Sequence, residues 1–292
     1  MPSFAVAKQV FTELVSSRDS YRVPEPDLIM DNPDNVRAFH EAGREEGVMA
    51  PVYLFHAAQV SSVIRPGDTV LDLGCGPANQ LGLVARLNPD VKFIGLDLSA
   101  EMLTMAAENL RNRGIKNVEL KECDITDLNI FKPESVDAVM STVVLHHLPD
   151  QSALFRCFSE VSRVLKPDGG LYLIDFGHLK TKAAIQYFAY QYENRQPPLF
   201  TLDYLHSLQA AFDLAIWQEG FNSFLKNKGN LFSTFLVPYM VAIKSGNRRE
   251  LPENVRAGLL KQLELMPDYH RTDIKDLITF FRLGGLKTSG IG

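Results

Sequence analysis

Strand-like and helix-like segments alternate through the middle of the chain. Short apolar runs rich in β-branched residues predict strands at residues 69–73, 92–97, 117–122, 136–143 and 171–176. The segments between them predict helices at residues 80–88, 99–112 and 152–165. Such an alternation is typical of a parallel sheet with helices on both faces, so the sequence predicts a doubly wound α/β fold.

The segments on either side of this alternation are mainly helical. Before residue 65 the pattern predicts helices at residues 1–17 and 34–63, the second broken near residues 43–51. After residue 176 it predicts a helix at 202–218, two strands that turn at Pro238 within 231–245, and two helices within 253–283. We therefore expect three parts, which are an N-terminal helical lid (1–64), a central domain with a seven-stranded, mostly parallel sheet (65–245) and a C-terminal helical extension (246–292).

Composition and charge narrow the class of protein. The chain has 292 residues, of which 46% are hydrophobic, so it can bury a sizeable core. A net charge of -5 argues against a broad nucleic-acid-binding surface. Three cysteines without paired spacing, and no basic and apolar leader at the N-terminus, favour a cytoplasmic protein. We expect no membrane span, because the apolar run at 231–243 is too short.

A glycine-rich turn follows the first predicted strand, in the run Val70-Leu71-Asp72-Leu73-Gly74-Cys75-Gly76. Glycines at this place let the backbone approach a ligand at the start of a helix. A dinucleotide-binding turn would carry a third glycine, whereas Pro77 and Ala78 follow here. The turn therefore favours a nucleoside cofactor without a pyrophosphate, and an ordinary strand-to-helix turn is the alternative.

Acidic residues follow the next two strands. Asp97 lies about 20 positions after the glycine turn, where a carboxylate can accept hydrogen bonds from both hydroxyls of a ribose. Its alternative role is to cap the helix that begins at Ser99. Asp124 follows the third strand, where its carboxylate could accept a hydrogen bond from the amino group of an adenine while Ile125 packs on the ring. The alternative for Asp124 is a solvated loop residue.

Five segments in this order resemble class I S-adenosylmethionine-dependent methyltransferases, particularly the branch of ubiquinone/menaquinone-type and other small-molecule enzymes. They are Val70-Leu71-Asp72-Leu73-Gly74-Cys75-Gly76, Gly95-Leu96-Asp97-Leu98-Ser99, Cys123-Asp124-Ile125, Leu145-His146-His147-Leu148-Pro149 and Arg163-Val164-Leu165-Lys166-Pro167-Asp168-Gly169-Gly170. Each segment is weakly specific alone, but together they are specific for the fold and the cofactor. The resemblance implies S-adenosyl-L-methionine as the cofactor and methyl transfer as the reaction.

The resemblance also implies a set of cofactor-binding residues. They are Asp72, Gly74, Gly76, Gln80, Asp97, Leu98, Met102, Asp124, Ile125 and Thr142. In this set Asp72 approaches the methionyl part and Thr142 faces its amine. Asp97 binds the ribose, and Leu98 and Met102 flank the adenine.

Residues for the acceptor side are less clearly marked. Methyl transfer needs an aligned acceptor and a dry site, while a general base is optional. His147, just after the fourth strand, is the best candidate base, although the pair with His146 could equally shape the loop. Tyr53, His56 and His146 are candidate substrate contacts. The aromatic residues within 187–204 could wall an apolar acceptor or pack between helices.

Several acceptor and partner classes lack their sequence signals. The fourth strand is not followed by the Asn/Asp-Pro-Pro-aromatic run of amino methyltransferases, and only Cys157 lies outside the cofactor motifs, which disfavours arsenic. No group of His, Asp and Glu has metal-ligand spacing, so we expect no metal. The leading hypothesis is methyl transfer to a small-molecule O, N, C or S nucleophile, without a nucleic-acid partner. The alternatives are a non-methyl-transferring enzyme on the same fold and a non-catalytic cofactor-binding scaffold. The terminal helices could support a homodimer.

Overall fold

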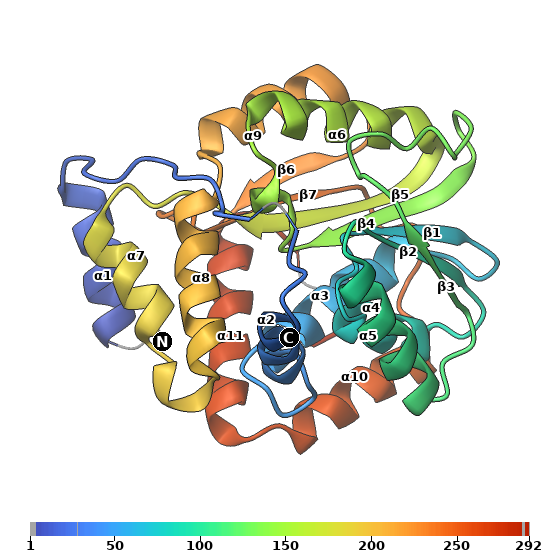
Figure 1. The fold of residues 1–292 in the computed structure, drawn as a ribbon, viewed down its shortest axis with the longest axis horizontal. Helices are drawn as coiled ribbons and strands as arrows, with labels where there is room; N and C mark the ends of the chain where they lie inside the picture. The colour runs from blue at the N-terminus through green and yellow to red at the C-terminus, as the bar shows by residue number, and fades with distance from the viewer. Residues whose placement is uncertain (1–3, 28, 288–289, 292) are drawn as a thin grey trace.

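The computed structural model describes residues 4–27, 29–287 and 290–291 (Figure 1). Within these residues the centre is a seven-stranded sheet with the order β3-β2-β1-β4-β5-β7-β6. Its strands are β1 (Thr69–Leu73), β2 (Lys92–Asp97), β3 (Val118–Glu122), β4 (Val136–Thr142), β5 (Leu165–Phe176), β6 (Asn230–Ser233) and β7 (Met240–Lys244). Strand β7 runs in the opposite direction to the other six and pairs antiparallel with β5 and β6, while the other neighbouring strands pair in parallel. The predicted doubly wound, mostly parallel sheet is confirmed.

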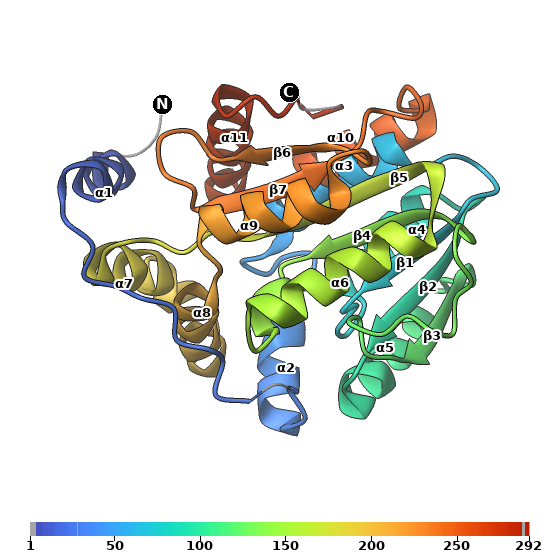
Figure 2. The same ribbon diagram turned by 90° about the horizontal axis from the view of Figure 1, so that it is seen from above.

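Helices cover both faces of the sheet and one end of it (Figures 1 and 2). They are α1 (Phe4–Val15), α2 (Pro33–Ala42), α3 (Ala50–Val63), α4 (Asn79–Leu87), α5 (Ala100–Asn112), α6 (Gln151–Val164), α7 (Lys182–Tyr190), α8 (Pro198–Ala210), α9 (Leu214–Gly220), α10 (Glu253–Leu265) and α11 (Asp268–Leu283), with short turns η1 (Leu145–His147), η2 (Glu193–Arg195) and η3 (Phe221–Leu225). No helix among the described residues is long and apolar enough to cross a bilayer.

The sheet has a separate hydrophobic core on each face. Successive side chains of a strand point to opposite faces, so in β1 Val70 joins the core under α3, α4 and α5, while Leu71 and Leu73 join the core under α6 and α9. Almost every residue of α3 is buried, as expected of a helix that is apolar all round. The helix just before the predicted boundary at residue 64 therefore belongs to the core of the sheet. The division into three parts stays a prediction.

Local side-chain chemistry explains several helix starts. The hydroxyl of Ser99 accepts a hydrogen bond from the backbone N–H of Met102 at 3.0 Å and caps α5. Asp150 caps α6 in the same way, through the N–H of Ala153 at 2.8 Å. Each of these side chains thus satisfies one of the free N–H groups in the first turn of its helix.

Two predicted elements differ from the structure. The helix predicted at 202–218 is divided into α8 and α9, because the chain between them turns in to pair Phe212 with Gly177. Strand β5 begins at Leu165, directly after α6, rather than at Leu171. The register of β5 against β4 shifts there, from the pair of Val136 with Leu165 to the pair of Ala138 with Gly170. The segment between the predicted helix and the predicted strand is therefore an irregular first part of β5.

A group of helices covers the end of the sheet at which β4 and β5 finish. It contains α1, α7 and α8, with α2 and α11 beside them (Figure 1). The segment of residues 16–27, which we call the strap, runs from α1 across this end. The N–H groups of Asp19 and Ser20 donate to the carbonyl of Lys180, and that of Val23 donates to the carbonyl of Gln209. The strap is thus tied to the helical group along its length.

Candidate functional site

A cavity of about 310 Å³ lies at the carboxyl ends of β1, β2 and β4. We call it the glycine-turn cavity. Ligands in doubly wound sheets bind at this edge, and the volume falls at the lower end of the range for small-molecule sites. All ten predicted cofactor residues line it, namely Asp72, Gly74, Gly76, Gln80, Asp97, Leu98, Met102, Asp124, Ile125 and Thr142. The structure therefore brings the whole predicted set together.

The turn after β1 depends on glycine for two physical reasons. Gly74 and Gly76 have φ values of 68° and 50°, in the left-handed region that favours glycine. A Cβ built on Gly74 would also lie 2.3 Å from Cγ2 of Val144. The bare backbone thus lets the loop after β4 approach the turn after β1 and shape the floor of the cavity.

Asp97 holds the glycine turn and the segment that leads into α5. Its Oδ2 accepts a hydrogen bond from the N–H of Gly76 at 2.8 Å, and its Oδ1 accepts one from the N–H of Ser99 at 3.0 Å. Burial raises the pKa of this carboxyl. Each oxygen keeps a further lone pair, so the same group that holds the turn and the start of α5 can accept hydrogen bonds from a ligand.

The polar groups in the floor of the cavity fit an amino-acid moiety. The side chain of Asp72 is 3% exposed, and burial together with the charge of Asp97 raises its pKa well above the usual range. Two buried carboxyls that lie close together repel each other when both are ionised. A cation beside them would stabilise their ionised forms. The amide of Gln80 and the hydroxyl of Thr142 are buried without a hydrogen-bond partner among the described residues. These unpaired donors and acceptors fit the ammonium and carboxylate of a methionyl group.

A second cavity, of about 170 Å³, lies under the helical group at the end of the sheet. We call it the aromatic cavity. Its walls include Phe176, Phe188, Tyr192, Phe200, Tyr204 and Tyr239. Phe188 and Tyr239 are stacked with ring centroids 4.5 Å apart. Among the aromatic residues expected as a wall, Tyr190 instead points outward and is 42% exposed.

Val143 lines both cavities. It follows β4, and its φ of 56° is strained for a β-branched residue. Its N–H donates to the carbonyl of Ile174 at 2.8 Å, which holds this conformation against β5. A single strained residue therefore lies between the glycine-turn cavity and the aromatic cavity. Strain of this kind is found at functional sites.

The predicted acceptor-side residues fall into two groups. Tyr53 and His147 line the glycine-turn cavity. His56 does not line it, because it lies in the core, where its Nδ1 is 2.7 Å from the hydroxyl of Tyr172. Burial lowers the pKa of His56 to about 3, so the ring is neutral. This placement gives no support to a substrate contact for His56.

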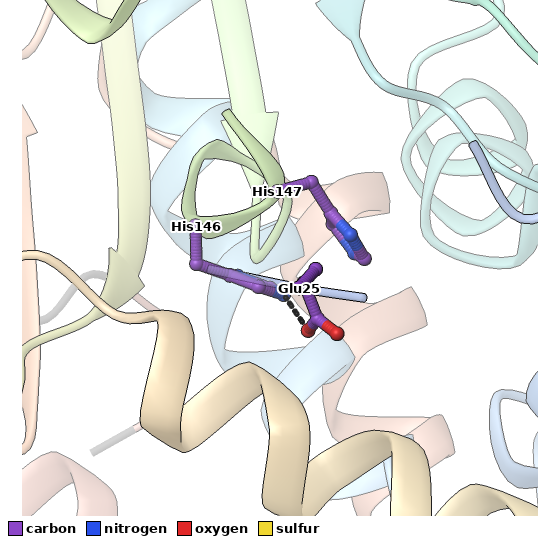
Figure 3. Close-up of side chains that lie close together, drawn as sticks. All are labelled: Glu25, His146 and His147. Carbon is purple, nitrogen blue, oxygen red and sulfur yellow. Dashed lines mark ion pairs between the residues drawn. The ribbon is translucent and has the colours of Figure 1, made fainter. Parts of the chain in front are cut away.

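His146 is the centre of a buried polar cluster (Figure 3). Its Nδ1 is 2.8 Å from Oδ1 of Asp175, and its Nε2 is 3.8 Å from Oε1 of Glu25 in the strap. The ring of His147 lies against it, with centroids 4.3 Å apart. Sequence reasoning missed Glu25, since the only local signal is its position between Pro24 and Pro26. His178 lies outside this cluster, and its Nε2 is 3.3 Å from the hydroxyl of Ser20 in the strap.

Comparison with known proteins adds a family. A family model described as a methyltransferase domain matches residues 64–234. A ubiquinone biosynthesis O-methyltransferase of Xanthomonas campestris is 30% identical over 167 residues, which are 57% of this chain and 66% of that protein. An arsenite methyltransferase of Halobacterium salinarum is 36% identical over 115 residues, which are 39% of this chain and 28% of that protein.

The matches with curated relatives are partial, and a solved structure supports the fold. The chain spans less than a third of the arsenite enzyme and 45% of a demethylmenaquinone methyltransferase of Lactobacillus johnsonii, which is 32% identical over 38% of this chain. The crystal structure of a SAM-dependent methyltransferase from Aquifex aeolicus is similar with a TM-score of 0.50. It is 18% identical and covers 73% of this chain and 97% of that one.

Proposed function

The chain belongs to the class I S-adenosylmethionine-dependent methyltransferases, and from this premise we propose that it methylates an apolar small molecule held in the aromatic cavity. The observation that carries the proposal is that Val143 lines both cavities. A cofactor in the glycine-turn cavity and an acceptor in the aromatic cavity would then meet at one residue, as an in-line transfer requires.

The cofactor would be held by the residues of the glycine turn and its neighbours. Asp97 would accept hydrogen bonds from the ribose hydroxyls, and Leu98 and Met102 would flank the adenine. Asp72 would face the ammonium group. What supports these roles is that the residues line one cavity and that Gln80 and Thr142 offer unpaired polar atoms to it.

When bound, S-adenosylmethionine supplies a methyl carbon that an acceptor lone pair attacks, while the carbon–sulfur bonding pair stays on sulfur. The chain contributes alignment and exclusion of water. The aromatic walls desolvate the acceptor, and Val143 fixes the point at which the two cavities adjoin. His147 would accept the acceptor proton in the absence of a metal. What supports this role is that His147 lines the glycine-turn cavity and that burial and the neighbouring His146 lower its pKa well below the usual value, so its ring is neutral.

An apolar organic acceptor suits the site better than arsenite. No cysteine is among the residues that line the aromatic cavity. Cys157 is fully buried in α6, and burial raises the pKa of its thiol to about 12. A thiol that is protonated and enclosed cannot bind a thiophilic substrate. The cytoplasmic location, the absence of a nucleic-acid partner and the homodimer stay predictions.

A direct test uses S-adenosylmethionine labelled in the methyl group, with apolar phenols of increasing size, arsenite and bulk tRNA as acceptors. We expect label in the organic-extractable phenol and one S-adenosylhomocysteine per methyl group transferred. Label only in arsenite or tRNA would contradict the acceptor class. Methylthioadenosine as the product would favour the non-methyl-transferring alternative, and cofactor binding without turnover on any acceptor would favour the scaffold.

A further inference from the structure

The strap brings a carboxylate to a pair of histidines. Glu25 comes from the strap, whereas His146 and His147 come from η1, directly after β4 (Figure 3). One ligand-type atom from each of the three residues lies within 4.8 Å of the other two. Because the two segments are far apart in the sequence, their spacing could not reveal this cluster.

The atoms that face one another in this cluster have no other partner. Oε1 of Glu25 and Nε2 of His146 are both buried without a hydrogen bond among the described residues. Their side chains are only 5% and 2% exposed. The two atoms form an ion pair with each other at 3.8 Å, which is too long for a hydrogen bond, and two buried polar atoms that both lack a hydrogen bond at one point indicate a ligand that both could bind.

The orientation of His146 is fixed by a second carboxylate. Its Nδ1 donates to Oδ1 of Asp175 at 2.8 Å, and its backbone N–H donates to Oδ2 at 2.8 Å. The Nε2 lone pair is then directed at Glu25. A carboxylate behind a histidine in this way is the usual arrangement around a histidine that binds a metal.

The strap is anchored where it meets the histidines. Arg22 donates to the carbonyl of Leu148 at 2.6 Å and to that of Pro149 at 2.8 Å. Pro24 and Pro26 restrict the backbone on both sides of Glu25. The position of the carboxylate is therefore part of the fold.

We propose that Glu25, His146 and His147 bind one divalent transition-metal ion. Two imidazole nitrogens and one carboxylate oxygen are a ligand set suited to zinc, iron, cobalt or manganese. The carboxylate of Asp175 adds negative charge beside His146. His147 also lines the glycine-turn cavity, so the free coordination positions open toward it.

The metal would act on the acceptor, and this role rests on the proposed function. A hydroxyl oxygen of the acceptor that reaches past Val143 into the glycine-turn cavity would take a free coordination position, and the metal would lower the pKa of that hydroxyl. With His147 bound to the metal, the proton would leave to a water molecule rather than to His147, and the oxyanion would attack the methyl carbon while the carbon–sulfur bonding pair stays on sulfur. Three protein ligands with an open position are the pattern of a catalytic rather than a structural metal site.

Metal binding can be measured without any methyl acceptor. The metal-free full chain is dialysed against Co²⁺, the bound metal is quantified, and visible d–d absorption is recorded. We expect one Co²⁺ per chain, displaced by Zn²⁺. Glu25→Gln and His147→Gln should weaken binding at least tenfold, and Asp175→Asn about 10- to 100-fold. His40→Gln, which removes a half-buried histidine outside the cluster, should bind as the wild type does.

Wild-type protein that retains no Co²⁺, or equal binding by Glu25→Gln and the wild type, would overturn the metal site. The measurement on the wild type can overturn the metal site by itself, so the test does not depend on whether each variant folds. Methyl transfer to a phenol by a chain that binds no metal would leave the proposed function standing and remove only the metal. Bound Co²⁺ without methyl transfer to any acceptor would leave the metal site standing and contradict the proposed function.

Discussion

The two cavities are built in different ways. The glycine-turn cavity is formed mainly by strand ends and the turns that follow them, so its lining residues are set by short segments such as Gly74–Gly76. The aromatic cavity is assembled from α1, α7, α8, α11 and the loop between β6 and β7, which are far apart in the sequence. Cofactor recognition therefore depends on local backbone geometry, and acceptor recognition depends on long-range packing.

The largest expected effect is the loss of the ribose contact. Asp97→Ala should weaken binding of S-adenosylhomocysteine by about 100-fold or more, since two hydrogen bonds to a charged group contribute roughly 1.5–3 kcal/mol each. Calorimetric titration measures this affinity. Ser99→Ala is the matched control, because it removes the cap of α5 at a cost of about 1 kcal/mol without removing the carboxylate. Equal losses in both variants would mean that Asp97 only supports the helix.

The next effect concerns the backbone of the turn. Gly74→Ala should lower the free energy of unfolding by about 2–3 kcal/mol and S-adenosylhomocysteine affinity by about tenfold, because the new Cβ meets Val144 and the positive φ is unfavourable. Denaturant unfolding and calorimetry measure the two quantities. Gly67 is the matched control, because its φ is 84° and a Cβ built on it has nothing within 4 Å. Gly67→Ala should lower the free energy of unfolding by only about 1 kcal/mol and leave the affinity for S-adenosylhomocysteine unchanged. An unaltered affinity in Gly74→Ala would refute the close approach.

A smaller effect should separate the two cavities. Phe200→Leu should raise the KM for a phenolic acceptor about fivefold, since an aromatic contact contributes roughly 0.5–1.5 kcal/mol beyond its buried area. The affinity for S-adenosylhomocysteine should not change. Leu199→Ala is the matched control, because Leu199 precedes Phe200 and is 44% exposed. A change in cofactor affinity in Phe200→Leu, with KM unchanged, would reverse the assignment of the cavities.

The smallest expected effect is a pH dependence from Lys244, which lines neither cavity. Burial in β7 lowers the pKa of Lys244 to about 8, from an ordinary value of 10.5. Between these values the unfolded chain binds more protons, so stability rises with pH across this window. Lys244→Met removes this contribution. Denaturant unfolding should show the variant more stable by about 1 kcal/mol at pH 7 and the difference shrinking by pH 10.5. A constant difference would contradict the shifted pKa.

The division between the cavities also explains what the sequence could predict. The bounds of β1 and β2 follow from local patterns, and the resemblance carried by short motifs at strand ends and turns implied the cofactor set, whose residues line one cavity. The position of Glu25 beside His146 depends on a strap that crosses the sheet end, and no spacing encodes it. The strained backbone of Val143 has no sequence signal either, since valine is typical of an ordinary strand.

Contacts between distant segments also explain features that the sequence did not reveal. The helix predicted at 202–218 is interrupted by the pairing of Phe212 with Gly177, which is a contact between distant segments. Helix α3 joins the main core because α10 and α11 pack against it from the other end of the chain. Periodicity describes one segment at a time, so it could not anticipate either contact.

The most direct test of two cavities that adjoin at Val143 is a crystal structure of the chain with S-adenosylhomocysteine. We predict density in the glycine-turn cavity, with the ribose at Asp97 and the sulfur directed at Val143 and the aromatic cavity beyond it. A ligand bound elsewhere, or one whose sulfur faces away from Val143, would contradict the account.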